Sequence, residues 1–403
     1  MSAITSSPGA LRLFTISIVA RLPLAMLTIG MLVHVEAATE SFAVAGLACG
    51  ILAVAQGVGG PLLGRLVDRR GQTTVLVVSA LVAGAALAAV AALPADAPLG
   101  ALLALAAVLG ASTPPVAACM RTLLPVVVRS PDDLRAAYAV DSAAVELTWI
   151  SGPPLVLLVG ATWSTGAALT VAGTLLVGST LLFAAAPASR SWRGDGSGAS
   201  VGRGAIRSAG VRTLALVLGG AGVLFGATEV AVTAAAQELG QTAAAGPLLG
   251  LWGLGGLLGG LVAARSGGGA RTGTGLALLL ASLAGAHLAL AAAAGSLLAL
   301  GAAIVLAGTL IAPTCATAYA MVDAVAPHGT VTEAFAWLAT AVALGTSIGA
   351  AAAGIVADAG GAAPTFVLGG AAAAVVAVIA ASRAHTVSPG VAAAHPSAVP
   401  ASA

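Results

Sequence analysis

Long apolar runs separated by short polar breaks make up most of the sequence. About 20 consecutive apolar residues suffice to cross a bilayer as a helix. Twelve stretches meet this condition: 14–34, 42–63, 74–93, 99–124, 138–160, 165–186, 213–236, 244–264, 273–293, 297–321, 333–357 and 365–383. Turn residues such as Gly, Pro and Asp occupy most of the breaks, which are short. The pattern predicts an all-α membrane protein in which consecutive helices run antiparallel.

The stretch 187–212 differs from the apolar runs on both sides. It carries five Arg among Gly and Ser, a composition typical of a flexible linker. We therefore expect a six-helix bundle in residues 1–186, a basic cytoplasmic linker in 187–212 and a second bundle in 213–383. The remaining residues, 384–403, are rich in Ala, Pro and Ser, which predicts a disordered cytoplasmic tail.

Composition narrows the possible environments and partners. Hydrophobic residues account for 59% of the chain and the mean hydropathy is +1.06, which indicates lipid rather than water as the solvent. A net charge of +2 over 403 residues argues against a nucleic-acid partner. The sequence has no nucleotide-binding loop, and we expect neither a metal nor any other cofactor.

The arginines are distributed unevenly along the predicted topology. If the chain crosses the membrane twelve times and both termini are cytoplasmic, every Arg except Arg21 and Arg121 falls on the cytoplasmic side. The charged residues of the outer loops are then all acidic. Basic residues favour the cytoplasmic side of membrane helices. We expect a monomeric multi-pass protein of a bacterial inner membrane, with both termini in the cytoplasm.

The densest charge cluster, GRLVDRRGQT at 64–73, has a weaker copy 196 residues later, GLVAARSGGG at 260–269. In the copy, Ala264 replaces Asp68. Pro115 and Pro313 lie 198 residues apart, each in the fourth span of its half. Paired halves with Pro-interrupted spans are typical of transporters whose site lies between the halves. The sequence therefore predicts two pseudo-symmetric six-helix bundles.

Gly64, Asp68, Arg69 and Gly71, between the second and third spans, resemble the signature loop of the major facilitator superfamily. The sequence departs from that pattern after Gly71, where Gln72, Thr73 and Thr74 replace the basic pair of the family. The resemblance implies alternating access by rocking of the two halves, with these four residues in a conformational latch. A carboxylate at the inner rim can bind the N-terminus of a neighbouring helix in one conformation only.

The fifth span also resembles, in part, that of the drug/proton antiporters of this superfamily. It contains Gly152-Pro153-Pro154, but Leu155, Val156 and Leu157 follow in place of the later Gly pair. The partial resemblance favours export of the substrate.

Five charged side chains lie within predicted spans and not at their first or last residue: Arg21, Arg121, Asp141, Glu146 and Glu229. Such a group costs roughly 2.5–3.5 kcal/mol at the bilayer centre, so each is expected to face a cavity or a partner. One interpretation is structural: Arg21 pairs with Glu146, and Arg121 pairs with Asp141 near an inner gate.

The other interpretation is functional. Helical spacing places Glu146 on one face with Trp149, and Glu229 on one face with Phe225. A carboxylate beside an aromatic ring suits an amphipathic or cationic organic molecule. A carboxylate that moves relative to Arg21 could also exchange a proton. We therefore expect substrate or proton binding at Arg21, Glu146, Trp149, Phe225 and Glu229.

Glycines crowd the second and eighth spans at spacings of three and four residues: Gly57, Gly60, Gly64, Gly246, Gly250, Gly253, Gly256 and Gly260. Such spacing lets helices approach closely. We expect these residues to form packing seams that slide when the halves rock.

The sequence favours a secondary active transporter that exports small organic compounds by proton exchange. An importer of sugars or organic acids remains an alternative. A membrane enzyme would need paired catalytic residues beside a large polar loop, and a receptor would need a sizeable soluble domain. We find neither feature and expect a protein that is not an enzyme.

Overall fold

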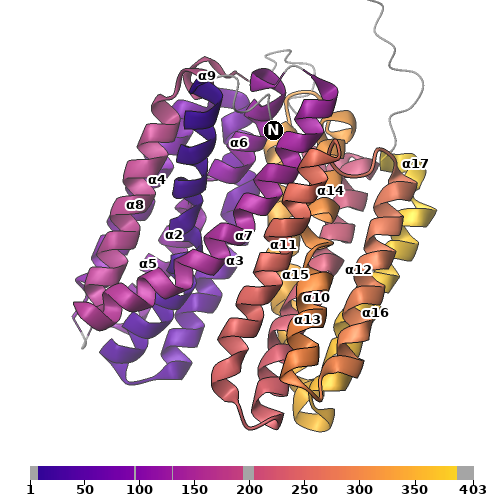
Figure 1. Ribbon diagram of the computed structural model, residues 1–403. Coiled ribbons are helices and arrows are strands. Elements are labelled where there is room, and N and C mark those ends of the chain that lie inside the picture. The colour runs from indigo at the N-terminus through magenta and orange to yellow at the C-terminus, as the bar shows by residue number, and fades with distance from the viewer. Residues whose placement is uncertain (1–7, 95–96, 129, 194–203, 388–403) are drawn as a thin grey trace, which may run out of the picture.

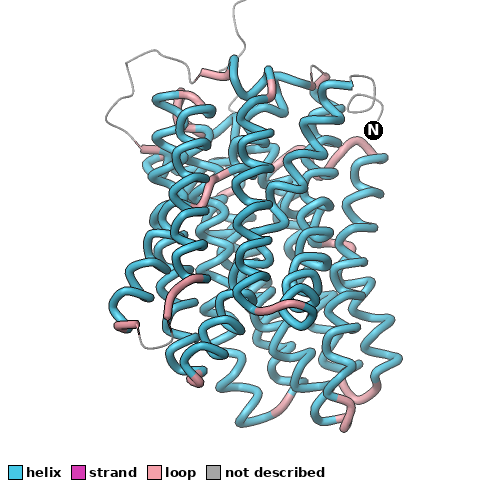
Figure 2. The backbone as a smooth tube through the Cα atoms, turned by 90° about the vertical axis from the view of Figure 1, so that its left-hand side faces the viewer, coloured by secondary structure: helices cyan, strands magenta, loops and turns pink. Residues whose placement is uncertain are grey.

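The computed structural model describes residues 8–94, 97–128, 130–193 and 204–387. Most of the predicted linker (194–203) and tail (388–403) therefore lies outside the described residues. Twelve helices in the described part are long and apolar enough to cross a membrane, which confirms the predicted number of spans. Helices run between the two ends of the bundle and short loops connect them (Figure 2).

The first half contains the earlier six spans. Its helices are α2 (Pro8–Thr39), α3 (Phe42–Arg70), α4 (Gln72–Ala91), α5 (Leu99–Ser112), α6 (Val116–Val127), α7 (Pro131–Thr162) and α8 (Thr165–Ala185). The short helix α9 (Pro187–Ser191) follows.

The second half repeats this order after the 3₁₀ turn η2 (Ala205–Arg207). Its elements are α10 (Ala209–Glu238), η3 (Thr242–Ala244), α11 (Ala245–Arg265), α12 (Gly273–Ala293), α13 (Leu297–Gly308), α14 (Ile311–Val325), α15 (Val331–Gly360), α16 (Ala362–Ser382) and α17 (Ala384–Val387).

Two boundaries differ from the sequence expectation. The predicted linker contains α9 and the start of α10. Helix α10 begins inside it because the Ser208 side chain accepts a hydrogen bond from the Val211 N–H and caps the helix. Helix α17 extends the ordered chain past residue 383, and its Val387 is buried. Composition missed both features because each depends on tertiary contacts of a short segment.

Equivalent helices make equivalent contacts in the two halves. Helix α2 packs on α7 and α8, as α10 packs on α15 and α16, and α4 packs on α8 as α12 does on α16. The halves meet mainly through α3 with α15 and α7 with α11. Figure 1 shows the two bundles side by side, with both described chain ends at one end of the molecule.

The fourth and tenth spans are each broken where the sequence places a proline. The first break lies between α5 and α6, at Thr113-Pro114-Pro115. The second lies between α13 and α14, at Thr309 and Leu310. The ring of Pro313 would collide with the carbonyl of the residue four positions earlier, Thr309, in a continuous helix. Proline chemistry thus accounts for both interruptions.

Candidate functional site

Most of the described arginines lie at one end of the bundle, where Arg70 and Arg265 end α3 and α11 and Arg271 precedes α12. We call it the arginine-rich end. Here Asp68, the last-turn acid of α3, binds the first turn of α15. The Thr332 N–H donates to Oδ1 at 3.0 Å and the Glu333 N–H donates to Oδ2 at 2.8 Å. These are two of the N–H groups that a helix leaves unpaired at its start.

Asp68 therefore acts as the N-cap of a helix in the opposite half. Thr330, at the N-cap position of α15 itself, makes no side-chain capping bond. The Asp68 side chain is only 7% exposed, so the contact is shielded from water. The sequence predicted that an inner-rim carboxylate can bind a helix N-terminus, and the structure identifies α15 as that helix.

Space and backbone angle explain two glycines of the predicted latch, Gly64 and Gly71. A Cβ on Gly64 would lie 2.9 Å from the Thr332 carbonyl oxygen, so any side chain there would push α3 away from α15. Gly71 has φ +86°, a left-handed conformation that other residues rarely adopt. It separates α3 from α4 by a single residue. Arg69 lies exposed in the last turn of α3.

At the repeated turn, residues 260–269, the contact between the halves joins a basic side chain to a helix C-terminus instead of an acid to an N-terminus. Ala264 stands where Asp68 stands, and it cannot cap a helix. Instead, the Arg135 side chain of α7 donates from Nε to the Gly267 carbonyl at 3.3 Å, just beyond the end of α11. An arginine is favourable at a helix C-terminus as an acid is at an N-terminus. Both seams between the halves are therefore held at this end, by different chemistry.

Three candidate charges meet in one buried cluster. Arg21 Nη2 lies 2.6 Å from Asp141 Oδ1, and Arg121 Nε donates to Asp141 Oδ2 at 2.8 Å. Each of the three side chains is 4% exposed or less. Two guanidinium groups thus share one carboxylate, and Arg21 Nε and Nη1 have no hydrogen-bond partner within the described residues.

This cluster corrects one predicted ion pair. The sequence interpretation paired Arg21 with Glu146, but Arg21 pairs with Asp141, which also binds Arg121. Helical spacing identifies which residues share a face of one helix, and it does not give the height at which a neighbouring helix crosses. Asp141 lies more than one turn before Glu146 on α7, so a small error in that height changes the partner.

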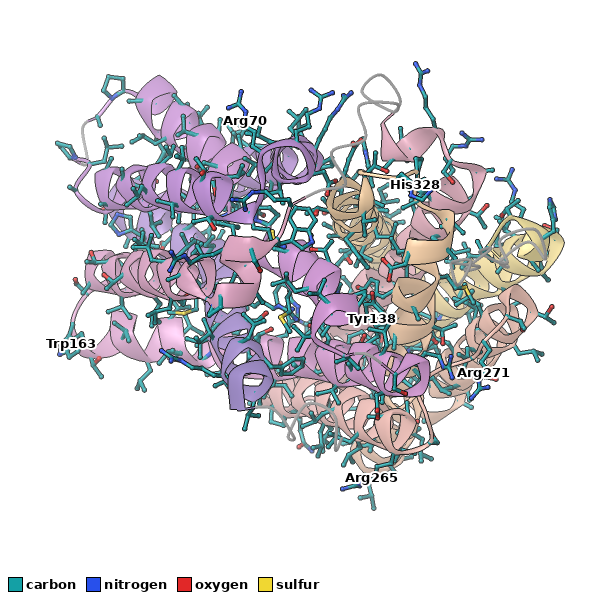
Figure 3. All side chains as sticks on the ribbon, turned by 90° about the horizontal axis from the view of Figure 1, so that it is seen from above. Arg70, Tyr138, Trp163, Arg265, Arg271 and His328 are labelled. Atoms are coloured by element: carbon teal, nitrogen blue, oxygen red, sulfur yellow. The ribbon has the colours of Figure 1, made fainter. Side chains whose placement is uncertain are left out.

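Aromatic residues connect the buried cluster to the second half. The Arg121 guanidinium lies 3.7 Å from the ring centroid of Tyr319 on α14, a favourable cation–π geometry. The Tyr138 hydroxyl donates to Asp323 Oδ2 at 3.1 Å, and Figure 3 shows Tyr138 between the halves. Sequence reasoning missed Tyr319 and Asp323. The available signal was that Tyr138 and Tyr319 are the chain's two tyrosines and both lie in spans.

Glu146 lies at the α7–α11 seam, apart from the buried cluster. A Cβ on Gly256 would lie 2.9 Å from the Glu146 Cδ, and one on Gly253 would lie 2.9 Å from Ile150. The glycines of α11 therefore provide the space that Glu146 occupies. Among the described residues, Glu146 has no ion-pair or hydrogen-bond partner.

Trp149 is 56% exposed, although it lies well inside a membrane span. On α7, Gly152 and Val156 face α2 while Glu146 and Ile150 face α11. Trp149 is three residues from both Glu146 and Gly152, so it points between α2 and α11. The lipid-facing side of α7 carries other residues, such as Leu147 and Leu158. Trp149 therefore faces the space between the halves.

Glu229 occupies a comparable position on α10. Gly222 and Gly226 pack against α15, and the Phe225 ring packs edge-on against Trp252 of α11 at 5.8 Å. Glu229 follows Gly226 by three residues and Phe225 by four, so it points between α11 and α15. It is exposed. Since α11 and α15 form the interface with the first half, Glu229 also faces the space between the halves.

The glycine seams are closed in their inner part and open in their outer part. Gly253, Gly256 and Gly260 approach side chains of α7, and the Thr340 hydroxyl donates to the Gly57 carbonyl at 3.0 Å. Farther from the arginine-rich end, four glycines on the same helix faces have no atom within 4 Å of a Cβ position: Gly46, Gly50, Gly246 and Gly250. The halves therefore touch at the arginine-rich end and separate toward the other.

Comparison with known proteins agrees with this geometry. The sequence profile of the Major Facilitator Superfamily matches residues 13–312. A comparison with curated protein sequences finds no significant match.

Solved transporter structures share the fold at low sequence identity. The human organic anion transporter TETRAN superposes with a TM-score of 0.70 at 18% identity, covering 93% of this chain and 100% of its own. A bacterial homologue of the iron transporter ferroportin, in an outward-facing state, superposes with a TM-score of 0.71 at 12% sequence identity. The match covers 92% of this chain and 98% of the homologue. The Escherichia coli fucose:proton symporter superposes with a TM-score of 0.68 at 16% sequence identity. The match covers 95% of this chain and 99% of the symporter.

Proposed function

The chain belongs to the major facilitator superfamily and is a secondary transporter that works by alternating access, and from this premise we propose that it exports small amphipathic organic compounds in exchange for protons. The observation that carries the proposal is Glu146, a membrane-embedded carboxylate at the seam between the halves with no ion-pair partner among the described residues. An ionised carboxylate is costly to bury without a partner.

Glu146 can couple proton binding to rocking for a simple physical reason. When α7 and α11 pack through Gly253 and Gly256, the carboxyl group loses water. When the seam opens, water returns. The free energy of holding a proton at Glu146 then differs between the two conformations, and a proton gradient can drive one of them.

The substrate would bind in the space between the halves, at the side chains that face it. Trp149 offers an exposed ring from α7, and Glu229 offers an exposed carboxylate from α10 beside Phe225. A ring face and an acid together attract an organic cation or an amphipathic molecule with a cationic group. We assign the buried cluster of Arg21, Arg121 and Asp141 to the inner gate.

Uptake into proteoliposomes under an imposed pH gradient tests the proposal with a panel of dyes, drugs and sugars. We expect Glu146→Gln and Glu229→Gln each to reduce pH-driven transport at least tenfold, since glutamine cannot exchange a proton. The exposed Glu40 at the opposite end supplies the control, because Glu40→Gln should transport normally. Full pH-driven transport by both variants would exclude these acids, and sugar accumulation would favour an importer.

We also propose that the arginine-rich end faces the cytoplasm of a bacterial cell, with both termini inside. The support is the excess of basic residues at this end. A membrane-impermeant thiol reagent should label a cysteine at the exposed Thr162 from outside intact cells, and a cysteine at the exposed Ser191 only after lysis. The reverse pattern would invert the topology.

A further inference from the structure

A groove runs along the outside of the first half, where α3 and α4 diverge. It has a volume of about 380 Å³, and its lining includes Leu66, Arg70, Thr74, Val78, Val82 and Val108. It lies on the lipid-facing surface, apart from the space between the halves. The proposed transport mechanism makes no use of it.

The break in the fourth span creates this groove. Helix α5 packs against both α3 and α4, and it ends at Ser112. After the two prolines, α6 turns into the protein, and most of its residues are buried. No helix of the described chain then fills the surface between the inner parts of α3 and α4. The remaining space extends from the end of α5 to the arginine-rich end.

The walls of the groove have the length and polarity to hold a lipid acyl chain. Val78, Val82 and Val108 are between 41% and 55% exposed, and in a membrane they face hydrocarbon. From Thr74 to Val82 the groove follows α4 for about 12 Å at 1.5 Å per residue. One leaflet contributes about 15 Å of the hydrocarbon core. The groove therefore spans most of one leaflet.

The end of the groove is cationic. Arg70 is exposed in the last turn of α3 and lines the groove beside Thr74. Within the described part of the chain, Arg70 makes no ion pair or hydrogen bond. Its guanidinium can bind a phosphate through two parallel N–H groups. Among the described residues that line the groove, none is acidic and able to compete for Arg70.

We propose that this groove binds one anionic phospholipid, with an acyl chain along α4 and the phosphate against Arg70. A zwitterionic lipid fits the same apolar walls, but its own ammonium group offsets the attraction of its phosphate for the arginine. The bound headgroup touches the last turn of α3, whose Asp68 holds α15. The proposal does not depend on which substrate is transported.

Native mass spectrometry of the purified full-length protein tests this site. The protein is presented with an equimolar mixture of phosphatidylglycerol and phosphatidylcholine that carry identical acyl chains. One basic residue near a membrane surface contributes about 1 kcal/mol toward binding anionic lipid, about fivefold. We expect Arg70→Gln to lower the retained ratio of phosphatidylglycerol to phosphatidylcholine about fivefold for the most tightly held lipid.

Two further variants locate the effect. Arg265, exposed in the last turn of α11, does not line the groove, and Arg265→Gln should keep the wild-type ratio. Ala111 is exposed and lines the groove, so Ala111→Phe should fill it and release the tightly held lipid of either class. An unchanged ratio in Arg70→Gln, an equal loss in Arg265→Gln, or full retention in Ala111→Phe would each overturn the proposal.

Discussion

Replacing Asp141 with Asn is expected to destabilise the protein by about 3–5 kcal/mol, the usual cost of removing one partner from a buried ion pair. Asp141 is fully buried and is the acid shared by Arg21 and Arg121. Its neutralisation leaves two buried guanidinium groups without a counter-charge. Thermal unfolding in detergent should therefore show a large fall in the midpoint temperature.

Two further variants separate this effect from a general sensitivity to substitution. Asp358 is exposed at the other end of the bundle, and Asp358→Asn should unfold like the wild type. Adding Arg21→Gln to Asp141→Asn should recover part of the lost stability, because it removes one of the two uncompensated charges. A midpoint in Asp141→Asn that matches the wild type would show that the cluster does not need its carboxylate.

Replacing Asp68 with Asn is expected to shift the population away from the conformation in which the arginine-rich end is closed. The two N–H groups donate to different oxygens of Asp68, so an Asn in the same position would accept one of them with its amide oxygen and turn its NH₂ group toward the other. Hydrogen bonds to a charged group contribute about 1.5–3 kcal/mol. A loss of about 2 kcal/mol in one conformation changes the ratio of the two states roughly 30-fold.

The kinetic consequence distinguishes a latch from a binding residue. Asp68 lies at the arginine-rich end and does not face the space between the halves, so Asp68→Asn should slow turnover more than it weakens substrate binding. The half-buried Asp133 lies in the first turn of α7, and Asp133→Asn provides a matched loss of charge at that end. Unchanged turnover in Asp68→Asn, or an equal effect in Asp133→Asn, would count against a latch.

The arrangement of spans followed from the sequence because lipid imposes a simple rule. Each crossing must satisfy its own backbone, which requires a helix of about 20 apolar residues. The duplicated turn and the paired prolines then indicated two equivalent halves. The family resemblance implied a latch at Asp68, and a carboxylate at the inner rim can bind a helix N-terminus; the structure identifies that helix as α15.

The ion-pair partners of the charged residues inside the spans could not all be predicted from the sequence. Spacing placed Asp141 and Glu146 correctly on α7, but Arg21 could reach either residue depending on how α2 crosses it. The role of Tyr319 could not be derived, because its contact with Arg121 joins residues from opposite halves. Contacts of that kind depend on the rigid-body placement of two bundles, which local pattern does not encode.

The glycine seams show the same limit. Their three- and four-residue spacing predicted close packing along whole helix faces. In the structure, Gly253, Gly256 and Gly260 pack closely, while Gly246 and Gly250 face open space. The same row of glycines serves both conformations of the transporter, and the structure shows the conformation in which only its inner part is packed.

Distances between spin labels across the two halves test alternating access most directly. One label pair, at Ser191 and Ser266, reports the arginine-rich end, and another, at Thr162 and Thr242, reports the opposite end; all four sites are exposed. The background replaces Cys49, Cys119 and Cys315 with alanine. The account predicts that Asp68→Asn lengthens the first distance and shortens the second. Distances that stay fixed, or that lengthen together, would contradict it.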